Sequence, residues 1–451
     1  MIPIRSGLVA RRLPSGMRVA GLGRSGVTTS CGHPSNSGAM PAVWDPQKAR
    51  HRRENGMTLK TVSVLIPTYN RADWLIECLE SIFAQTRRPD EIIVIDDGST
   101  DDTLERLKAY GSEIRVLTQE NSGKSAALNR ALPVAKGELI WIVDSDDLVT
   151  PDGLEILLAA LEADPEAGFA YGRHDRFETG PDGRKRWMPT GYWEVCEPED
   201  FLFETLLDMF VHQPAMLVKR ELYERAGAFD ESFIRSQDYE MLLRLATLGR
   251  PAPARRIVFH QRQHEGPRGT AAHVIWYADR ERCWQRFDKI IFERLYNTLP
   301  LSKYLPSDNR QTEPGAIRRA FIRRGVVMAR KNLWTVAGAD FEKAARMSDQ
   351  PLSLEEAADL RRLFMRKYAA DDIVLMPEVK KLLLSLKQIS AAGASMSVVI
   401  GRALVWRVRK ALQRGNILMA FRLASLVINL NIPSKRKLRE VPSSFVRKVS
   451  R

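Results

Sequence analysis

The chain has 451 residues, of which 44% are apolar and 27% charged, enough for two domains or for one large domain with an appendage. Its four cysteines, Cys31, Cys78, Cys196 and Cys283, form no CxxC pair, which argues against a disulfide scaffold or a zinc site and fits a reducing compartment. No apolar run reaches about 18 residues, so the sequence predicts no membrane-spanning helix.

The net charge of +14 is unevenly distributed along the chain. Residues 1–56 carry 9 Lys and Arg against 2 acids, and residues 401–451 carry 13 against 1, so residues 57–400 have a net charge of −5. Basic ends indicate a nucleic acid or an anionic membrane surface as partner. No DNA- or RNA-binding motif accompanies the charge, so we expect no nucleic-acid partner.

Residues 1–56 are rich in Gly, Ser, Pro and Arg and contain no acid before Asp45. They predict a disordered basic N-terminal segment. The composition resembles a transit peptide, but it also fits a start codon assigned too far upstream, with the true start near Met57. We favour the second interpretation.

Short apolar strands alternate with amphipathic helices in the segment that follows. Strands are predicted at 62–66, 92–95, 114–117 and 139–143, with a helix after each of the first three. Strands that are apolar along their whole length are typical of a sheet buried on both faces. The pattern therefore predicts an α/β fold with a Rossmann-like, mostly parallel sheet and helices on both sides.

A polar motif follows each of these strands. The motifs are Pro67-Thr-Tyr-Asn-Arg71, Asp96-Asp-Gly-Ser-Thr-Asp-Asp-Thr103, Asn121-Ser-Gly-Lys124 and Asp144-Ser-Asp-Asp147. Ligands of open α/β sheets bind outside the carboxyl ends of the strands. We therefore expect all four motifs to converge on one edge of the sheet, around one ligand.

Three carboxylates, Asp144, Asp146 and Asp147, end the fourth strand abruptly. An unpaired buried carboxylate costs several kcal/mol, so such a cluster should face a cation or hydrogen-bond donors. Oxygen ligands suit Mg²⁺ or Mn²⁺, and Mg²⁺ is commonly shared between carboxylates and substrate phosphates. The cluster thus predicts a divalent metal and a phosphate-bearing substrate. The alternative is a capped turn between strand and helix.

The other motifs suit a nucleotide. A base can lie against the backbone and ring at the end of the first strand, and the carboxylate of Asp97 can accept an N–H from a uracil-type base. Gly123 and Lys124 begin a helix, where free N–H groups and the helix dipole attract phosphate. The alternative for the end of the first strand is an ordinary turn, and the alternative for Asp97 is a cap of the following helix.

The second half of this region has a different pattern. Strands are predicted at 169–172, 213–218 and 257–259, with a turn at 180–183. Asp238 stands at the start of a helix, where a carboxylate can accept a proton from a hydroxyl or simply cap the helix. His264 follows the last strand and is either a metal ligand or an ordinary core or surface histidine.

In this order and spacing, the motifs resemble glycosyltransferase family 2 over about residues 61–264. The resemblance implies the A-type glycosyltransferase fold and sugar transfer, with inversion, from a nucleotide-sugar. It implies Asp238 as general base, Asp146 and His264 as metal ligands, and Asp97 as the residue that reads the base, with Asp96 supporting the loop. The residues implied for binding the nucleotide-sugar are Pro67, Thr68, Tyr69, Asn70, Arg71, Asp97, Gly123, Lys124, Asp144 and Ser145.

Two departures from the family pattern affect these roles. The family usually has Glu-Asp where this chain has Gln237-Asp238, and it often has Arg where this chain has Ala127 and Leu128. Lys124 is then the nearer cation for the phosphates.

We predict three parts: a disordered segment at 1–56, a glycosyltransferase catalytic domain at 57–270 and a helical C-terminal extension at 271–451. Amphipathic helices are expected from Trp276 to Leu295 and at 317–333, 354–368, 377–389, 397–412 and 416–430. Apolar and basic residues alternate in the last pair. Either these two helices pack on the enzyme through residues such as Val405, Trp406, Leu412, Leu418 and Phe421, or they lie on an anionic membrane.

The sequence therefore predicts a metal-dependent inverting glycosyltransferase with Mn²⁺ or Mg²⁺ as cofactor. The donor is a nucleotide-sugar, most simply UDP-linked, and the acceptor a glycan, a lipid-linked saccharide or another surface polymer of a bacterial cell envelope. The expected location is cytoplasmic, peripheral at the inner face of the cell membrane. One alternative is transfer to a polyprenyl phosphate. Another is a non-catalytic nucleotide- or glycan-binding module, suggested by Gln237 alone.

Overall fold

The structure is a computed structural model that describes residues 60–189, 192–264, 268–270, 273–275, 280–306, 315–365 and 376–432. All of these residues fall in one compact unit, Arg50–Arg451. The predicted disordered segment 1–56 lies outside the described residues.

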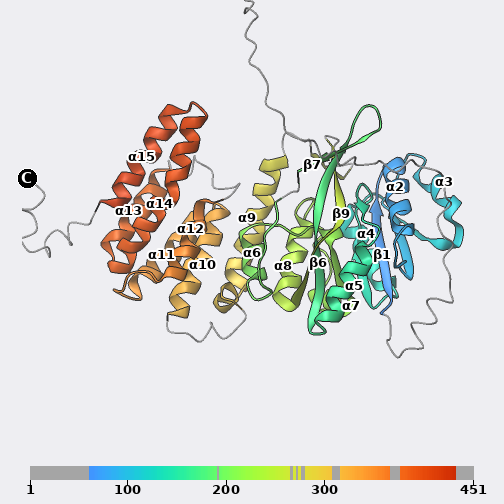
Figure 1. Ribbon diagram of the computed structural model, residues 1–451, viewed down its shortest axis with the longest axis horizontal. Coiled ribbons are helices and arrows are strands. Elements are labelled where there is room, and N and C mark those ends of the chain that lie inside the picture. Colours follow the sequence, from blue (N-terminus) through green and yellow to red (C-terminus); the bar gives the residue numbers. More distant parts are fainter. Residues whose placement is uncertain are drawn as a thin grey trace, which may run out of the picture. The chain divides into compact units, whose positions relative to one another are not determined.

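A nine-stranded mixed sheet forms the centre of the region predicted as the catalytic domain (Figure 1). Its order is β3-β2-β1-β4-β8-β6-β9-β5, and β7 pairs with β6 at the side. The strands are β1 (Val62–Thr68), β2 (Glu91–Asp96), β3 (Arg115–Thr118), β4 (Leu139–Ile142), β5 (Leu148–Val149), β6 (Ala167–Thr179), β7 (Lys185–Met188), β8 (Met216–Lys219) and β9 (Arg250–Gln263).

The prediction of a mostly parallel sheet holds for the first four strands, where β2 lies parallel to β1 and β3, and β1 parallel to β4. The later strands make the sheet mixed. β8 runs antiparallel to β4 and β6, β7 antiparallel to β6, and β5 antiparallel to β9. The turn at 180–183 joins β6 and β7 as a hairpin, a short connection that only antiparallel strands allow.

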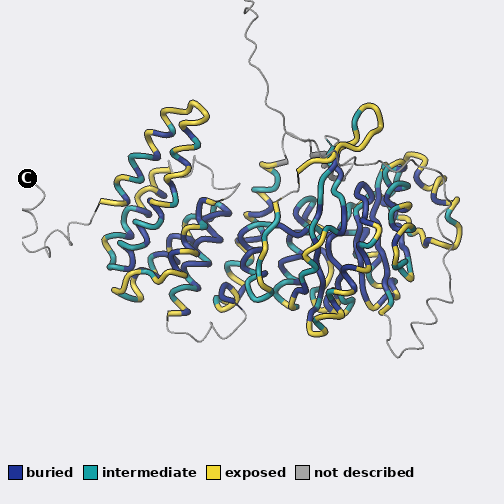
Figure 2. Tube along the Cα trace, in the orientation of Figure 1, coloured by how far each residue is buried: buried dark blue, intermediate teal, exposed yellow. Residues whose placement is uncertain are grey.

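Helices cover the sheet because each has one apolar face. In α2 (Ala72–Phe83), Leu75, Cys78, Leu79 and Ile82 are buried, while every residue of β1 is buried (Figure 2). The other helices of this region are α3 (Thr103–Leu107), α4 (Lys124–Ala131), α5 (Gly153–Ala163), α6 (Phe201–Leu207), α7 (Arg220–Ala226) and α8 (Gln237–Leu248). The predicted α/β architecture is thus confirmed.

The C-terminal extension is helical, as predicted. Before its first helix, β10 (Arg268–Thr270) and β11 (His273–Ile275) form a small hairpin across the predicted boundary at 270. Its helices are α9 (Arg280–Thr298), α10 (Ala316–Arg330), α11 (Trp334–Arg346), α12 (Leu354–Arg361), α13 (Pro377–Ser385), α14 (Ala391–Gln413) and α15 (Ile417–Asn431). Helix α11 was not predicted, and part of the predicted helix 354–368 lies outside the described residues.

A second apolar core joins this extension to the region of the nine-stranded sheet. It contains Leu206 of α6, Tyr239 and Leu243 of α8, and side chains of α9 to α15 such as Phe292 and Phe341. The helices α6 and α8 therefore have one face toward each core. The division at residue 270 stays a prediction.

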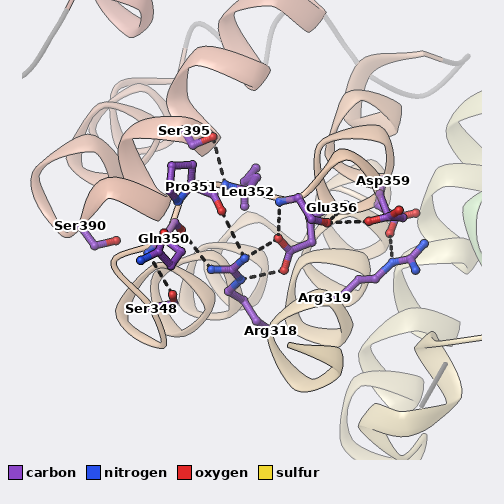
Figure 3. Close-up of polar contacts among 12 residues, drawn as sticks. Arg318, Arg319, Ser348, Gln350, Pro351, Leu352, Glu356, Asp359, Ser390 and Ser395 are labelled. Carbon is purple, nitrogen blue, oxygen red and sulfur yellow. Dashed lines mark hydrogen bonds and ion pairs between the residues drawn. The ribbon is translucent and has the colours of Figure 1, made fainter. Parts of the chain in front are cut away.

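A cluster of ion pairs fixes α12 against α10 (Figure 3). Arg318 donates two hydrogen bonds to the carboxylate of Glu356, at 2.7 and 2.6 Å. Glu356 also completes a capping box with Ser353 at the start of α12. Arg319 pairs with Asp359 one turn further along, at 2.6 Å. Both carboxylates are buried and both are paired, as a compact helical fold requires.

Candidate active site

Asp144, Asp146 and Asp147 form a compact cluster directly after β4. Each of them can place a carboxylate oxygen within 4.8 Å of the others. Asp146 and Asp147 are buried and Asp144 is partly exposed. The backbone N–H of Asp147 donates to the carbonyl of Asp144 at 3.0 Å, so a tight turn holds all three at the strand end. This donor set fits a divalent ion with oxygen ligands.

Three predicted side chains of opposite charge or metal-binding type meet these acids. Arg71 Nη1 lies 2.9 Å from Asp146 Oδ2, and His264 Nε2 lies 3.1 Å from the same oxygen. Lys124 forms an ion pair with Asp144. The residues come from the end of β1, the start of α4 and the end of β9, so the predicted convergence at one sheet edge is what the structure shows. Asp146 and His264 lie close enough together to share one ion.

The charges of the acid cluster and of Asp238 both act on the pKa of Lys124. Burial alone would lower the pKa of Lys124, but the charges of Asp144, Asp238 and Asp146 outweigh it and raise the pKa. The lysine therefore stays a cation at neutral pH. The influence of Asp238 on Lys124 also places the candidate base in the same electrostatic environment as the candidate metal ligands.

Arg262 holds the turn that carries the three acids. It was not assigned to the site from the sequence. Its side chain is 1% exposed. Its backbone N–H donates to Asp147 Oδ1 and its Nε to the carbonyl of Asp146, both at 2.9 Å. Nη2 lies 3.2 Å from Glu77, and the guanidinium lies over the ring of Phe177. Arg262 thus fixes the acid-bearing turn, and its spacing of two residues from His264 was the only signal in the sequence.

Asp97 holds the loop between β3 and α4 in this structure through hydrogen bonds. Its two oxygens accept hydrogen bonds from the side chains of Gln119 and Asn121 and from the N–H groups of Ser122 and Gly123, at 2.7 to 3.2 Å. These four bonds use the accepting capacity of the carboxylate, so reading a base would require one of them to exchange. The role of Asp97 in base recognition stays a prediction.

The neighbouring loop is braced in the same way. Asp96 accepts from the N–H of Ser99, which confirms its predicted supporting role. Asn70, with a positive φ of 49°, accepts from the N–H of Thr100 at 2.7 Å. These bonds tie the end of β1 to the loop after β2. The side chain of Asn70 therefore holds the loop after β2 in place, and its predicted contact with the nucleotide stays a prediction.

The start of α4 is only partly open to a phosphate. The N–H of Gly123 is donated to Asp97, and no side chain caps the helix. The N–H groups of the first turn, from Lys124 onward, have no partner within the helix. They and the Lys124 side chain are what this site offers an anion.

Buried polar atoms without a hydrogen-bond partner in the described structure border the site. They are Thr68 Oγ1 at the end of β1, Ser125 Oγ in the first turn of α4 and Gln237 Oε1 beside Asp238. Native proteins leave few buried polar atoms unsatisfied, and such atoms need an explanation. Ser145 is also buried, between Asp144 and Asp146, and Pro67 and Tyr69 adjoin Thr68 at the end of β1.

Asp238 lies in the first turn of α8, half-buried, with Oδ1 accepting from the N–H of Tyr239 at 2.9 Å. The preceding Ser236 has a left-handed conformation with a φ of 61°. Among the described residues, Asn70, Arg255 and Asn332 are the other non-glycine residues with a positive φ, and asparagine adopts this region readily. The N-cap residue Ser236 makes no side-chain capping bond.

Residues 63–227 match the family model for glycosyl transferase family 2. This region is therefore similar to family 2 glycosyl transferases. Its sheet topology and this match together confirm the predicted A-type glycosyltransferase fold. The match ends before Asp238 and His264, so the roles of these two residues stay proposals.

Curated relatives agree with this family. A chondroitin synthase of Pasteurella multocida is 32% identical over 207 residues, which cover 45% of this chain and 20% of the relative. The glycosyltransferase GlyG of Streptococcus pneumoniae is 39% identical over 178 residues, which cover 36% of this chain and 58% of the relative. The matched segment thus spans less than two thirds of either relative. Among solved structures, S. aureus TarS has a TM-score of 0.44 and 18% identity, covering 80% of this chain and 54% of that chain.

Proposed function

We propose that this protein is an inverting glycosyltransferase that moves a sugar from a nucleotide-sugar, most simply UDP-linked, to a hydroxyl of a glycan, a lipid-linked saccharide or a surface polymer. One observation carries the proposal: the three acids after β4 lie within 4.8 Å of one another, and His264 Nε2 lies 3.1 Å from Asp146. The charge of Asp238 acts on the pKa of Lys124 together with the charges of Asp144 and Asp146, which supports a shared site for the metal and the base.

The acid cluster and His264 would hold a divalent ion, Mn²⁺ or Mg²⁺. When bound, the ion would act as a Lewis acid that stabilises negative charge on the diphosphate leaving group. Lys124 and Arg71 add fixed positive charge on the same side of the site. Arg262 keeps the turn in place through Asp147 and the carbonyl of Asp146.

Asp238 would act on the acceptor. Its carboxylate takes the proton of the acceptor hydroxyl as the oxygen attacks the anomeric carbon, and the nucleoside diphosphate leaves from the opposite face. A single displacement inverts the anomeric carbon and needs no carboxylate nucleophile, unlike a retaining glycosidase. The Gln237 departure leaves this acid intact.

The acceptor is proposed from chemistry and from the printed names of relatives. Chondroitin synthases and a hyaluronan synthase are among the relatives, which supports a growing saccharide chain. A polyprenyl phosphate is the second candidate, because a phosphate is already nucleophilic and would not require Asp238. The non-catalytic binding module is disfavoured because Asp144, Asp146 and Asp238 are all present.

A donor-hydrolysis screen tests the proposal. Full-length protein is incubated with a panel of nucleotide-sugars in the presence of Mn²⁺ or Mg²⁺, and release of the nucleoside diphosphate is measured. Release from one donor class identifies the sugar and nucleotide, and loss of release in EDTA establishes the metal. Nucleotide binding without any release, including with oligosaccharide or polyprenyl phosphate added, would support the binding module instead.

We further propose a cytoplasmic location, peripheral at the inner face of the cell membrane. The positive charge of residues 401–451 supports contact with anionic lipid. The cysteines in the described residues, Cys78, Cys196 and Cys283, are free, as a reducing compartment favours.

A further inference from the structure

Large apolar side chains are exposed on the helical hairpin of α14 and α15. Residues 412–418, which form its tip, are all exposed, and Figure 2 shows this tip in yellow. Ile417 is 72% exposed, Leu418 62% and Phe421 73%. Val405, Trp406 and Leu412 of α14 are exposed as well. These are the side chains that packing against the enzyme would bury, and in this structure they do not pack against it.

The exposed residues lie outside the packed face of each helix. On α15, Leu423, Leu426 and Leu430 are buried in the second core, while Ile417 and Phe421 lie one turn apart on the other side. On α14, Leu404 and Ala411 are buried, while Val405 and Leu412 follow the same seven-residue spacing one position later. The hairpin therefore has a second apolar face in addition to the one that holds it to the protein.

The charge around this face has one sign. Residues 379–439 contain no Asp or Glu and 13 Lys or Arg. Arg402, Arg409, Arg414 and Arg422 are exposed on the hairpin itself. A surface that is both apolar and cationic matches an interface with hydrocarbon beneath a layer of negative charge, and it does not match a partner held by charge alone.

We propose that the tip and outer face of the α14–α15 hairpin insert into the interfacial layer of a bilayer that contains anionic lipid. Trp406, Leu412, Ile417, Leu418 and Phe421 enter the boundary between head groups and acyl chains. The arginines reach the lipid phosphates. The inference deepens the peripheral location proposed above and rests on it, but it does not depend on the chemistry of the active site.

The hairpin lies on the membrane in this proposal and does not cross it. By length and composition, α14 is long and apolar enough to span a bilayer, with a mean hydropathy of 1.2 over its most apolar window, which corrects the sequence expectation. Half of that window is buried inside the protein, however, and Arg402 and Arg407 belong to the helix. Crossing would require α14 to leave the second core, whereas insertion of the exposed face requires no such change.

Vesicle co-sedimentation of the full-length protein tests the inference. The probes are vesicles of phosphatidylcholine alone and vesicles with phosphatidylglycerol, at low and at high salt. We expect binding to the anionic vesicles only, with release at high salt because exposed charges are screened beyond about 8 Å at physiological ionic strength. No binding at low salt would overturn the proposal. Retention through high salt and alkaline carbonate would overturn it in favour of a spanning helix.

Three variants locate the surface. Ile417→Ser with Leu418→Ser and Phe421→Ser removes apolar contact. Arg409→Gln with Arg414→Gln and Arg422→Gln removes three charges, and should weaken binding on the order of a hundredfold. The matched control is Ile317→Ser with Leu354→Ser, because these side chains are 60% and 82% exposed on other helices of the extension. Equal binding by all three would overturn the proposal.

Two further readouts separate other outcomes. Sedimentation velocity without lipid shows whether the apolar face pairs with a second copy of the chain. A dimer that the serine variant abolishes, together with unchanged vesicle binding, would overturn the membrane assignment. Donor hydrolysis and the melting temperature should be the same in all variants. Absence of donor hydrolysis from the wild-type protein would count against the proposed function and leave the vesicle result standing.

Discussion

Lys331 Nζ donates a hydrogen bond of 3.2 Å to the hydroxyl of Tyr239, the residue next to Asp238. The same ammonium group lies 3.0 Å from Asp288 Oδ2, and the Tyr239 hydroxyl donates to the carbonyl of Thr205 at 2.7 Å. Lys331 stands between α10 and α11, and Asp288 is on α9. The C-terminal extension is therefore hydrogen-bonded to the start of the helix that carries the candidate base.

The first prediction is that Lys331→Met both destabilises the protein and lowers turnover. The change leaves Asp288 buried without its cation, which typically costs about 3–5 kcal/mol. It also removes one of the hydrogen bonds at the Tyr239 hydroxyl, so Asp238 is less well positioned and turnover falls while donor affinity holds. Urea unfolding, donor titration and steady-state kinetics measure the three quantities. Lys289→Met is the control, because Lys289 is exposed on α9. Loss of stability with unchanged turnover would mean that the network has no positioning role.

The second prediction concerns the metal. Asp146→Ala should abolish transfer and metal-dependent nucleotide binding, because Asp146 lies at the centre of the acid cluster and next to His264. Nucleotide affinity with and without EDTA, measured by calorimetry, checks the effect. Asp152→Asn serves as the control, since this acid pairs with Arg256 on the surface nearby. Wild-type rates in EDTA or in Asp146→Ala would rule out a metal at this position.

The third prediction separates the base from the donor site. Asp238→Asn should retain donor affinity but reduce turnover by on the order of 10²–10⁴, the usual range for general-base catalysis. Glu240→Gln on the same helix turn is the control; Glu240 pairs with Arg244 at 2.6 Å and should affect turnover little. A parallel loss of donor binding and rate would place Asp238 on the donor side. An unchanged rate with a phosphate acceptor would favour the polyprenyl-phosphate alternative.

The front half of the fold could be predicted because its signals are local. The strands at 62–66 and 139–143 are each followed directly in sequence by a polar motif, and parallel topology alone brings the ends of these strands together. The strand β9 was harder, since only 257–259 has a continuous apolar pattern within a strand that runs from Arg250 to Gln263. Two prolines and four arginines in that strand obscure the periodicity.

The structural roles of Asp97 and Arg262 could not be predicted, because they depend on distant partners. Arg262 contacts Asp147 across 115 residues, and Asp97 is held by donors 22 to 26 residues further along the chain. A motif predicts the chemical role of a residue, but the hydrogen bonds that the residue makes depend on which distant residues the fold brings next to it. The exposed outer face of α15 is a further case, because its sequence is compatible with burial on all sides.

The fourth prediction concerns pH. Burial, together with the neighbouring His212, Arg176 and Arg173, lowers the pKa of His174 to about 3, and only Asp175 opposes this. The unfolded chain takes up this proton below about pH 6.5 and the folded chain does not, so stability is full above that pH and falls on acidification. Between pH 7 and pH 5, His174 lowers the free energy of unfolding by about 2 kcal/mol.

Urea unfolding of wild type and His174→Gln across that pH range measures the effect. The variant should show a shallower decline with acidification, whatever its stability at pH 7. His260, whose pKa burial also lowers, contributes equally to both proteins and cancels in the comparison. Parallel curves would show that His174 does not contribute to the acid sensitivity.

The fifth prediction concerns the ion pairs between α10 and α12 (Figure 3). Glu356 accepts two hydrogen bonds from Arg318 and one from the N–H of Ser353 at 2.8 Å, and its side chain is 4% exposed. Glu356→Ala should lower the free energy of unfolding by about 3–5 kcal/mol, because it leaves the Arg318 guanidinium without its buried partner. Glu356→Gln should lose less, since an amide can still complete the capping box.

The matched control for this pair is Glu342→Ala. Its partner Arg346 lies 3.8 Å away on the surface of α11, and exposed pairs contribute at most about 1 kcal/mol. Urea unfolding gives all three values, and donor hydrolysis at 25 °C should be unchanged, because these residues lie outside the candidate active site. If Glu356→Ala and Glu342→Ala cost the same, the buried pair contributes no more than a surface pair. The register of α12 against α10 would then depend on apolar packing through Leu360 and Leu363.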